Sequence, residues 1–71
     1  MMRKHSVTLY GHRTSITLED EFWNELKVIA LGKNVSIASI VQAVDEKRGL
    51  KYNLSSALRI YVLKHYQEKT S

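Results

Sequence analysis

Polar and apolar side chains alternate strictly through the six residues 13–18. The polar residues are Arg13, Ser15 and Thr17. The apolar or methyl-bearing residues are Thr14, Ile16 and Leu18. An extended chain places two such sets on opposite faces, and β-branched side chains without Pro or Gly suit a strand. A lone strand cannot satisfy its own backbone groups. We therefore expect one short β-strand at 13–18, paired with the same strand of a second copy.

The residues before this strand alternate as well, but in the other phase. Val7 and Leu9 fall on odd positions, whereas the later apolar set falls on even ones, with Gly11 and His12 between. The buried face must switch there, and Gly permits a turn or bulge. Two short strands meeting at Gly11, or an arm that folds back, both fit. We treat residues 1–12 as a basic arm and expect 1–4 to be disordered.

The period changes to that of a helix after residue 19. Phe22, Leu26 and Ile29 recur at helical spacing, which predicts a helix over residues 20–31. Acidic residues crowd its first turn and complement the helix dipole, and Gly32 is a natural stop. Trp23 lies beside the apolar stripe and is expected in the core.

Two further helices are predicted, over residues 36–47 and 54–66. Ser36 suits the N-cap of the first, and either Asn53 or Ser55 suits that of the second. Their apolar faces comprise Ile37, Ile40, Val41 and Val44, and then Leu54, Leu58, Tyr61, Val62 and His65. The fold class is thus mainly α with one short strand, in a single domain spanning residues 1–71.

The chain is short for an independent core. It has 71 residues and no cysteine, so neither a large core nor a disulfide stabilises it, and oligomerisation is the common remedy. With 44% hydrophobic and 25% charged residues it is not a disordered composition. We expect a homodimer. Its predicted core consists of Ile16, Leu18, Phe22, Leu26, Ile29, Ile40, Val41 and Val44.

The charge is unevenly distributed. The net charge is +4 and the pI about 9.6, yet the first acidic residue is Glu19. A basic segment of this kind is typical of nucleic-acid binding. No long apolar run or signal sequence is present, so we expect a cytoplasmic protein without a membrane partner.

The sequence gives little support for an enzyme. His5, His12 and His65 lack metal-ligand spacing, and no phosphate loop or nucleophile motif occurs. We expect no catalytic residue, no metal and no cofactor. The polar strand face is more informative, because Arg13 can donate two hydrogen bonds to guanine while Ser15 and Thr17 are adaptable donors and acceptors. These three are the predicted base-contacting residues.

The order of strand, helix, Gly-containing turn and Ser-capped helix resembles the ribbon-helix-helix family of bacterial DNA-binding proteins. The similarity covers residues 13–48, from the strand Arg-Thr-Ser-Ile-Thr-Leu to the turn Gly32-x-x-x-Ser36. It implies an intertwined homodimer whose two chains share a two-stranded antiparallel ribbon that enters the major groove. It also implies that the amides of Ser36 and Ile37 bind a DNA phosphate, as helix N-termini can.

Residues 54–59 also resemble the opening of the family's second helix. In that alternative the phosphate role passes from Ser36 to residues 53–56. The basic arm adds Arg3, Lys4 and His12 as predicted phosphate contacts. The resulting hypothesis is a sequence-specific binder of double-stranded DNA, acting as a repressor or autoregulator. The rival hypothesis is an interaction module, such as an antitoxin, that binds a protein through Trp23, Tyr61 and Tyr66.

Overall fold

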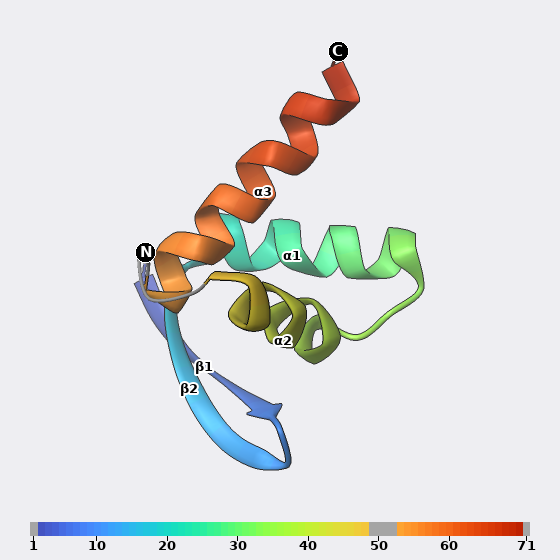
Figure 1. Cartoon of the computed structure of the whole chain (residues 1–71). Helices are drawn as coiled ribbons and strands as arrows, with labels where there is room; N and C mark the ends of the chain where they lie inside the picture. Colours follow the sequence, from blue (N-terminus) through green and yellow to red (C-terminus); the bar gives the residue numbers. More distant parts are fainter. Residues whose placement is uncertain (1, 49–52, 71) are drawn as a thin grey trace.

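The fold is a β-hairpin with three helices on one of its faces (Figure 1). The computed structural model describes residues 2–48 and 53–70. In chain order the elements are β1 (Met2–Leu9), β2 (His12–Glu19), α1 (Asp20–Lys33), α2 (Ile37–Arg48) and α3 (Leu54–Thr70). The two strands and α2 lie close together, while α3 starts beside the hairpin and runs away from it.

The hairpin corrects the expectation of one strand. β1 pairs antiparallel with β2, in a register that runs from Met2 opposite Glu19 to Leu9 opposite His12. The partner strand therefore comes from the same chain, and the basic arm, including its described residues 2–4, is largely β1. Of the two interpretations left open at Gly11, the structure contains the one with two strands. The reason is that a two-residue turn changes the phase, so that odd positions of β1 and even positions of β2 share the buried face.

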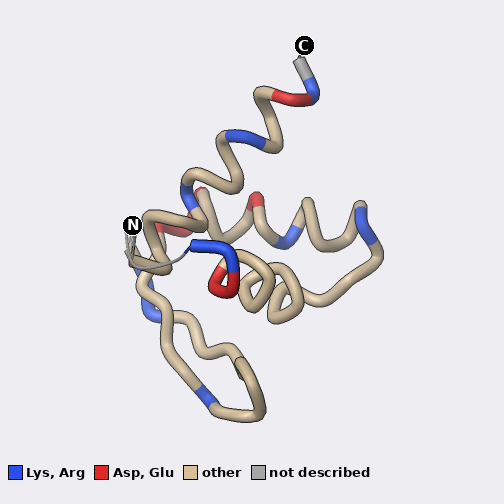
Figure 2. Tube along the Cα trace, viewed as in Figure 1, with Lys and Arg blue, Asp and Glu red and all other residues tan. Residues whose placement is uncertain are grey.

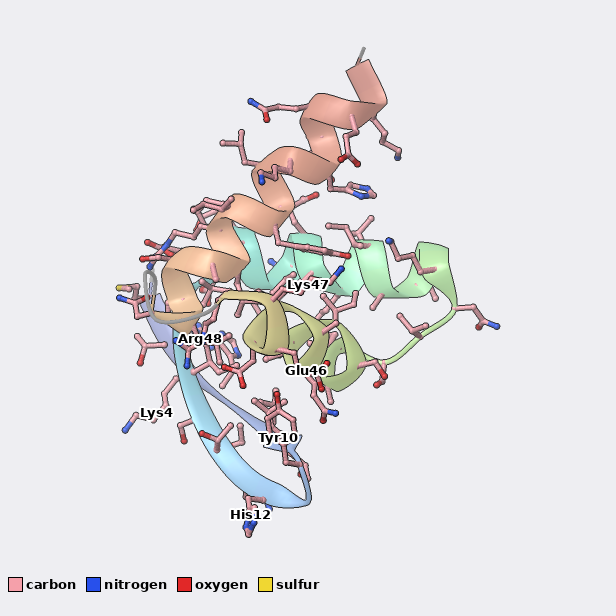
Figure 3. All side chains as sticks on the ribbon, viewed as in Figure 1. Lys4, Tyr10, His12, Glu46, Lys47 and Arg48 are labelled. Carbon is pink, nitrogen blue, oxygen red and sulfur yellow. The ribbon has the colours of Figure 1, made fainter. Side chains whose placement is uncertain are left out.

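The turn itself consists of Tyr10 and Gly11, and both have positive φ angles, of 54° and 78°. Two such residues form the turn that matches the right-handed twist of a hairpin. A positive φ angle is uncommon for Tyr, and contacts with α2 hold Tyr10 in this conformation. The Tyr10 N–H donates to Gln42 Oε1 at 3.2 Å and its hydroxyl donates to Asp45 Oδ2 at 3.0 Å (Figure 3). The hydrogen bond from Arg48 Nε, at 2.7 Å, lowers the pKa of Asp45 and so favours the carboxylate that accepts it.

Alanine substitutions at two glycines should have opposite effects. Gly11→Ala puts a Cβ on a residue with φ of 78° and should destabilise the fold by about 1–2 kcal/mol. Gly32→Ala lies inside α1 with open space around it and should stabilise the fold by about 0.5–1 kcal/mol. Urea denaturation of both variants measures the difference. If both substitutions changed the free energy of unfolding by the same amount in the same direction, the turn geometry described here would be contradicted.

α1 continues past Gly32, contrary to the expectation that this glycine ends it. The helix ends at Lys33, and Asn34 adopts the left-handed conformation with φ of 58° and ψ of 43°. Asn tolerates that conformation better than other residues with a side chain, so it serves where Gly is usual. The N–H of Val35 then donates to the carbonyl oxygen of Ala30 at 3.0 Å, which satisfies a terminal carbonyl.

The core lies between the inner face of the hairpin and the helices. Six of the eight predicted dimer-core residues are buried within this one chain, and Phe22 and Val44 are partly buried against them. α3 adds Ala57, Leu58 and Val62, of which Leu58 is 0% exposed. The third helix is therefore part of the core and not an appendage to it. Among the described residues no single helix is long and apolar enough to cross a membrane, and α1 and α2 meet that test only as a pair bent by 104°.

Candidate nucleic-acid interface

The hairpin presents a polar face on the side away from the helices. We call this the outer face of the ribbon. It comprises three cross-strand pairs, in which Lys4, Ser6 and Thr8 of β1 lie opposite Thr17, Ser15 and Arg13 of β2. All six residues are exposed, whereas Val7 and Leu9 on β1 and Ile16 and Leu18 on β2 are buried. The alternation seen in the sequence thus separates one polar face from one buried face on both strands.

The outer face is electropositive. Lys4 lies near one end and points away from the helices, and Arg13 lies near the turn, so cationic groups occupy opposite strands and opposite ends (Figure 3). His12 is exposed at the tip of the hairpin. Residues 2–18 include no acidic residue, and the first red segment along the hairpin is Glu19, the last residue of β2 (Figure 2). An anion that approaches this face therefore meets no carboxylate from residues 2–18.

The first two acidic residues of the chain, Glu19 at the end of β2 and Asp20 at the start of α1, are both paired with guanidinium groups. Arg59 Nε on α3 donates to Glu19 Oε1 at 2.8 Å, and this hydrogen bond lowers the pKa of the Glu19 carboxyl. Arg3 Nε lies 3.3 Å from Asp20 Oδ2. Arg3 lies opposite Leu18 in the strand register. Its position alternates with those of the outer-face residues, so Arg3 is not one of them. The two pairs offset carboxylate charge beside the ribbon.

Two helix N-termini were predicted as alternative phosphate sites, and they lie in different places. Ser36 Oγ accepts a hydrogen bond from the N–H of Ser39 at 3.0 Å and so caps α2. That helix packs on the inner side of the hairpin, as Figure 1 shows. The structure therefore does not bring Ser36 and Ile37 to the outer face of the same chain.

The N-terminus of α3 lies beside the ribbon instead. Asn53 Oδ1 accepts a hydrogen bond from the N–H of Ser56 at 2.8 Å and caps the helix. Ser55 Oγ donates to the backbone oxygen of Thr17 at 2.6 Å, which ties the first turn of α3 to the edge of β2. A shallow pocket lined in part by Ser15, Thr17 and Ser55 joins the two surfaces. Residues 53–56 thus flank the outer face.

Ser6 and Thr8 are the site residues that sequence reasoning missed. A signal for them was present, because they alternate with Val7 and Leu9 just as Ser15 and Thr17 alternate with Ile16 and Leu18. Because residues 1–12 were interpreted as an arm, the polar row on β1 was not predicted. The Tyr-Gly pair between the two alternating runs has the length of a hairpin turn.

The two other histidines of the chain, His5 and His65, pack against aromatic rings. The His5 ring stacks on Trp23 with centroids 4.0 Å apart, on the inner side of the ribbon, and the His65 ring meets Tyr66 edge to face. Within residues 2–48 and 53–70, no group of three His, Cys, Asp or Glu side chains could hold a metal ion. The side chains that the outer face offers are hydroxyls and cations, which bind anions and hydrogen-bonding groups.

These features define a β-ribbon domain: an exposed polar ribbon carried by helices. A family model described as a ribbon-helix-helix domain matches residues 2–66, so the chain belongs to the ribbon-helix-helix family. The match includes β1 and most of α3, which are therefore parts of the domain. Such domains generally bind DNA in transcription regulators or antitoxins, typically as dimers, and are generally not enzymes. Searches of curated proteins and of solved structures gave no match.

Proposed function

We propose that this protein binds double-stranded DNA in the cytoplasm by inserting the outer face of its ribbon into the major groove, and that it acts as a repressor or autoregulator. The observation that carries the proposal is the outer face itself, with six exposed polar side chains and no acidic one. A two-stranded antiparallel ribbon fits the major groove, where outward side chains reach base edges.

Each outer-face residue on β2 has a role in this proposal. Arg13 donates two hydrogen bonds to O6 and N7 of a guanine. Ser15 and Thr17 donate to or accept from neighbouring base edges, and the Thr17 methyl contacts thymine. Ser6 and Thr8 extend the same chemistry to β1, since they lie directly opposite Ser15 and Arg13.

The phosphate contacts come from the margins of the ribbon. Lys4 and His12 lie at its two ends, and Arg3 is close by. Residues 53–56 offer helix N-terminal amides beside Thr17, and this position favours them over Ser36 and Ile37 for contacts made by the same chain. Such contacts orient the protein on DNA but carry little sequence information.

A ribbon made by one chain has a consequence for its target. Lys4 faces Thr17 at one end and Thr8 faces Arg13 at the other, so the two strands present different side chains. A ribbon made of two identical strands would have a two-fold axis and would favour a palindrome. We infer that one hairpin reads a non-palindromic element, and that symmetry in the operator, if present, comes from a second hairpin of the homodimer.

The rival hypothesis of a protein-binding module loses the support that its aromatic residues gave it. Trp23 stacks on His5, and Tyr61 is partly buried against the core. The Tyr66 hydroxyl donates to the Glu25 carboxylate. All three side chains have contacts within the chain, whereas the outer-face residues point to solvent.

Amide chemical shifts during titration with a short mixed-sequence duplex test the proposal. The shifts should concentrate at residues 4–8, 13–17 and 53–56, because these line or flank the outer face. Repeating the titration at high salt is the control, since contacts to phosphates weaken as salt rises. Shifts that gather on α1 and the far half of α3, with none on the hairpin, would contradict the proposed mode of binding.

A further inference from the structure

The turn end of the ribbon, residues 8–13, is only weakly anchored by the core. Leu9 is the last buried residue of β1, and the next buried residue along the chain is Ile16 of β2. Residues 10–13, which include Arg13, are all exposed. Segments with few buried contacts open most readily, so the position of this end depends on its other contacts.

Tyr10 connects the turn end to α2. Its N–H donates to Gln42 Oε1 at 3.2 Å, and its hydroxyl donates to Asp45 Oδ2 at 3.0 Å. Gln42 and Asp45 are three residues apart in α2 and therefore lie on one side of that helix. Figure 3 shows Tyr10 pointing toward α2, whereas His12 and Lys4 point away from the helices. The side chain of Tyr10 thus faces the helices and not the outer face of the ribbon.

The acceptor of the Tyr10 hydroxyl is held as a carboxylate. Arg48 Nε donates to Asp45 Oδ1 at 2.7 Å, and this hydrogen bond is the main cause of the lowered pKa of Asp45. Desolvation and the hydrogen bond to Asp45 raise the pKa of the Tyr10 hydroxyl, which therefore keeps its proton. A hydrogen bond to an ionised acceptor is stronger than one between neutral groups.

Tyr is also an unexpected residue for this turn. A two-residue turn with two positive φ angles forms most readily with Asn followed by Gly, yet position 10 holds Tyr with a φ of 54°. Residues in sparsely populated backbone conformations persist where the surrounding structure imposes them, and they cluster at functional sites. A Tyr side chain reaches across to α2, which Gly cannot do.

The opposite end of the ribbon is held by a different helix. Ser55 Oγ of α3 donates to the backbone oxygen of Thr17 at 2.6 Å, and Thr17 lies opposite Lys4 in the strand register. Loss of the contacts from Tyr10 should therefore affect the position of Arg13 and leave that of Lys4 unchanged.

We propose that Tyr10 is a positioning residue, whose hydrogen bond to Asp45 holds the turn end of the ribbon on α2 so that Arg13 is in place before DNA binds. The inference rests on the proposed function, because it concerns how Arg13 reaches a base. A loop that is already held in its bound conformation loses less conformational entropy on binding. Tyr10 acts through Arg13 and does not itself touch DNA.

Backbone NMR relaxation of the full chain, without DNA, tests the first step. Tyr10→Phe removes only the hydroxyl, and it should lower the order parameters of residues 8–13 from about 0.85 toward about 0.6, with no change at residues 2–6. Tyr66→Phe is the matched control, since it removes the hydroxyl that donates to Glu25 on α1 and should leave the ribbon unchanged. Unchanged order parameters at residues 8–13 in Tyr10→Phe would overturn the positioning role.

A double-mutant cycle tests the second step, by fluorescence anisotropy with a duplex that the wild-type protein selects from a random pool. Tyr10→Phe alone should weaken binding by about two- to tenfold, the equivalent of one hydrogen bond. It should have no further effect when combined with Arg13→Ala, and it should keep its full effect when combined with Lys4→Ala. If the losses from Tyr10→Phe and Arg13→Ala add in full, Tyr10 does not act through Arg13 and the inference is wrong.

Tyr10→Asn separates positioning from folding. Asn followed by Gly favours this turn, so the variant should fold, as circular dichroism would show, but it lacks the hydroxyl and should bind the selected duplex as weakly as Tyr10→Phe does. Wild-type affinity in folded Tyr10→Asn would contradict the inference, and this variant alone decides if Tyr10→Phe unfolds. A wild-type protein that selects no duplex would overturn the proposed function and, with it, the role of Tyr10 in binding. Failure in the relaxation experiment or in the cycle, with DNA binding by the wild type intact, would overturn the role of Tyr10 alone.

Discussion

Leu58→Ala is expected to destabilise the protein by roughly 2–5 kcal/mol, because it removes a fully buried side chain and leaves a cavity. Leu58 comes from α3 and packs in the same cluster as Leu18 of β2 and Leu26 of α1, which are also 0% exposed. A single substitution in α3 should therefore weaken the packing of the ribbon against the helices. Chemical denaturation followed by circular dichroism measures the change in the free energy of unfolding.

Leu31→Ala is the control for this prediction. It makes the same chemical change at a side chain that is 84% exposed, so its effect should stay within about 0.5 kcal/mol. The same two variants report on the role of α3. A loss at Leu58 no larger than that at Leu31 would mean that α3 is not part of the core.

The sequence pattern predicted three helices, and the structure contains three among its described residues, since amphipathic spacing is a local signal; α3 runs to Thr70, four residues beyond the predicted end at 66. It also identified the face of β2, because alternation separates Ile16 and Leu18 from Arg13, Ser15 and Thr17. The pairing partner of β2 was harder to predict. Whether a strand pairs with its own chain or with another depends on the turn between them, and Tyr10 is not a residue that usually signals a turn with two positive φ angles. The contacts from Tyr10 to Gln42 and Asp45, which compensate for it, lie more than 30 residues away.

The residues at the margins of the site were also hard to predict, because their positions depend on contacts between distant parts of the chain. A helix cap such as Asn53 can be predicted locally, but its position beside Thr17 depends on how α3 packs on the rest of the chain. Gly32 gave a misleading local signal, because Asn34 two residues later could also end the helix. Tertiary packing thus decided which of two N-termini flanks the ribbon.

Arg13→Ala is expected to reduce specific DNA binding by roughly 1–3 kcal/mol with little change in stability. The side chain is exposed on the outer face, so the core does not depend on it. In our proposal the Arg13 guanidinium recognises one guanine. Its removal should therefore weaken the preference for guanine at that one position of the DNA site. Lys4 lies on the opposite strand at the other end of the ribbon and is expected to contact phosphate. Lys4→Ala should therefore weaken binding to all sequences alike.

The most direct test compares wild type, Arg13→Ala and Lys4→Ala on two labelled duplexes, one selected from a random pool by the wild-type protein and one a scrambled version of it. Fluorescence anisotropy at a fixed salt concentration gives the six dissociation constants. Our account predicts that Arg13→Ala loses affinity for the selected duplex and little for the scrambled one, while Lys4→Ala loses similar affinity for both. It would be contradicted if Arg13→Ala bound the selected duplex as tightly as wild type does, or lost equal affinity for the two duplexes.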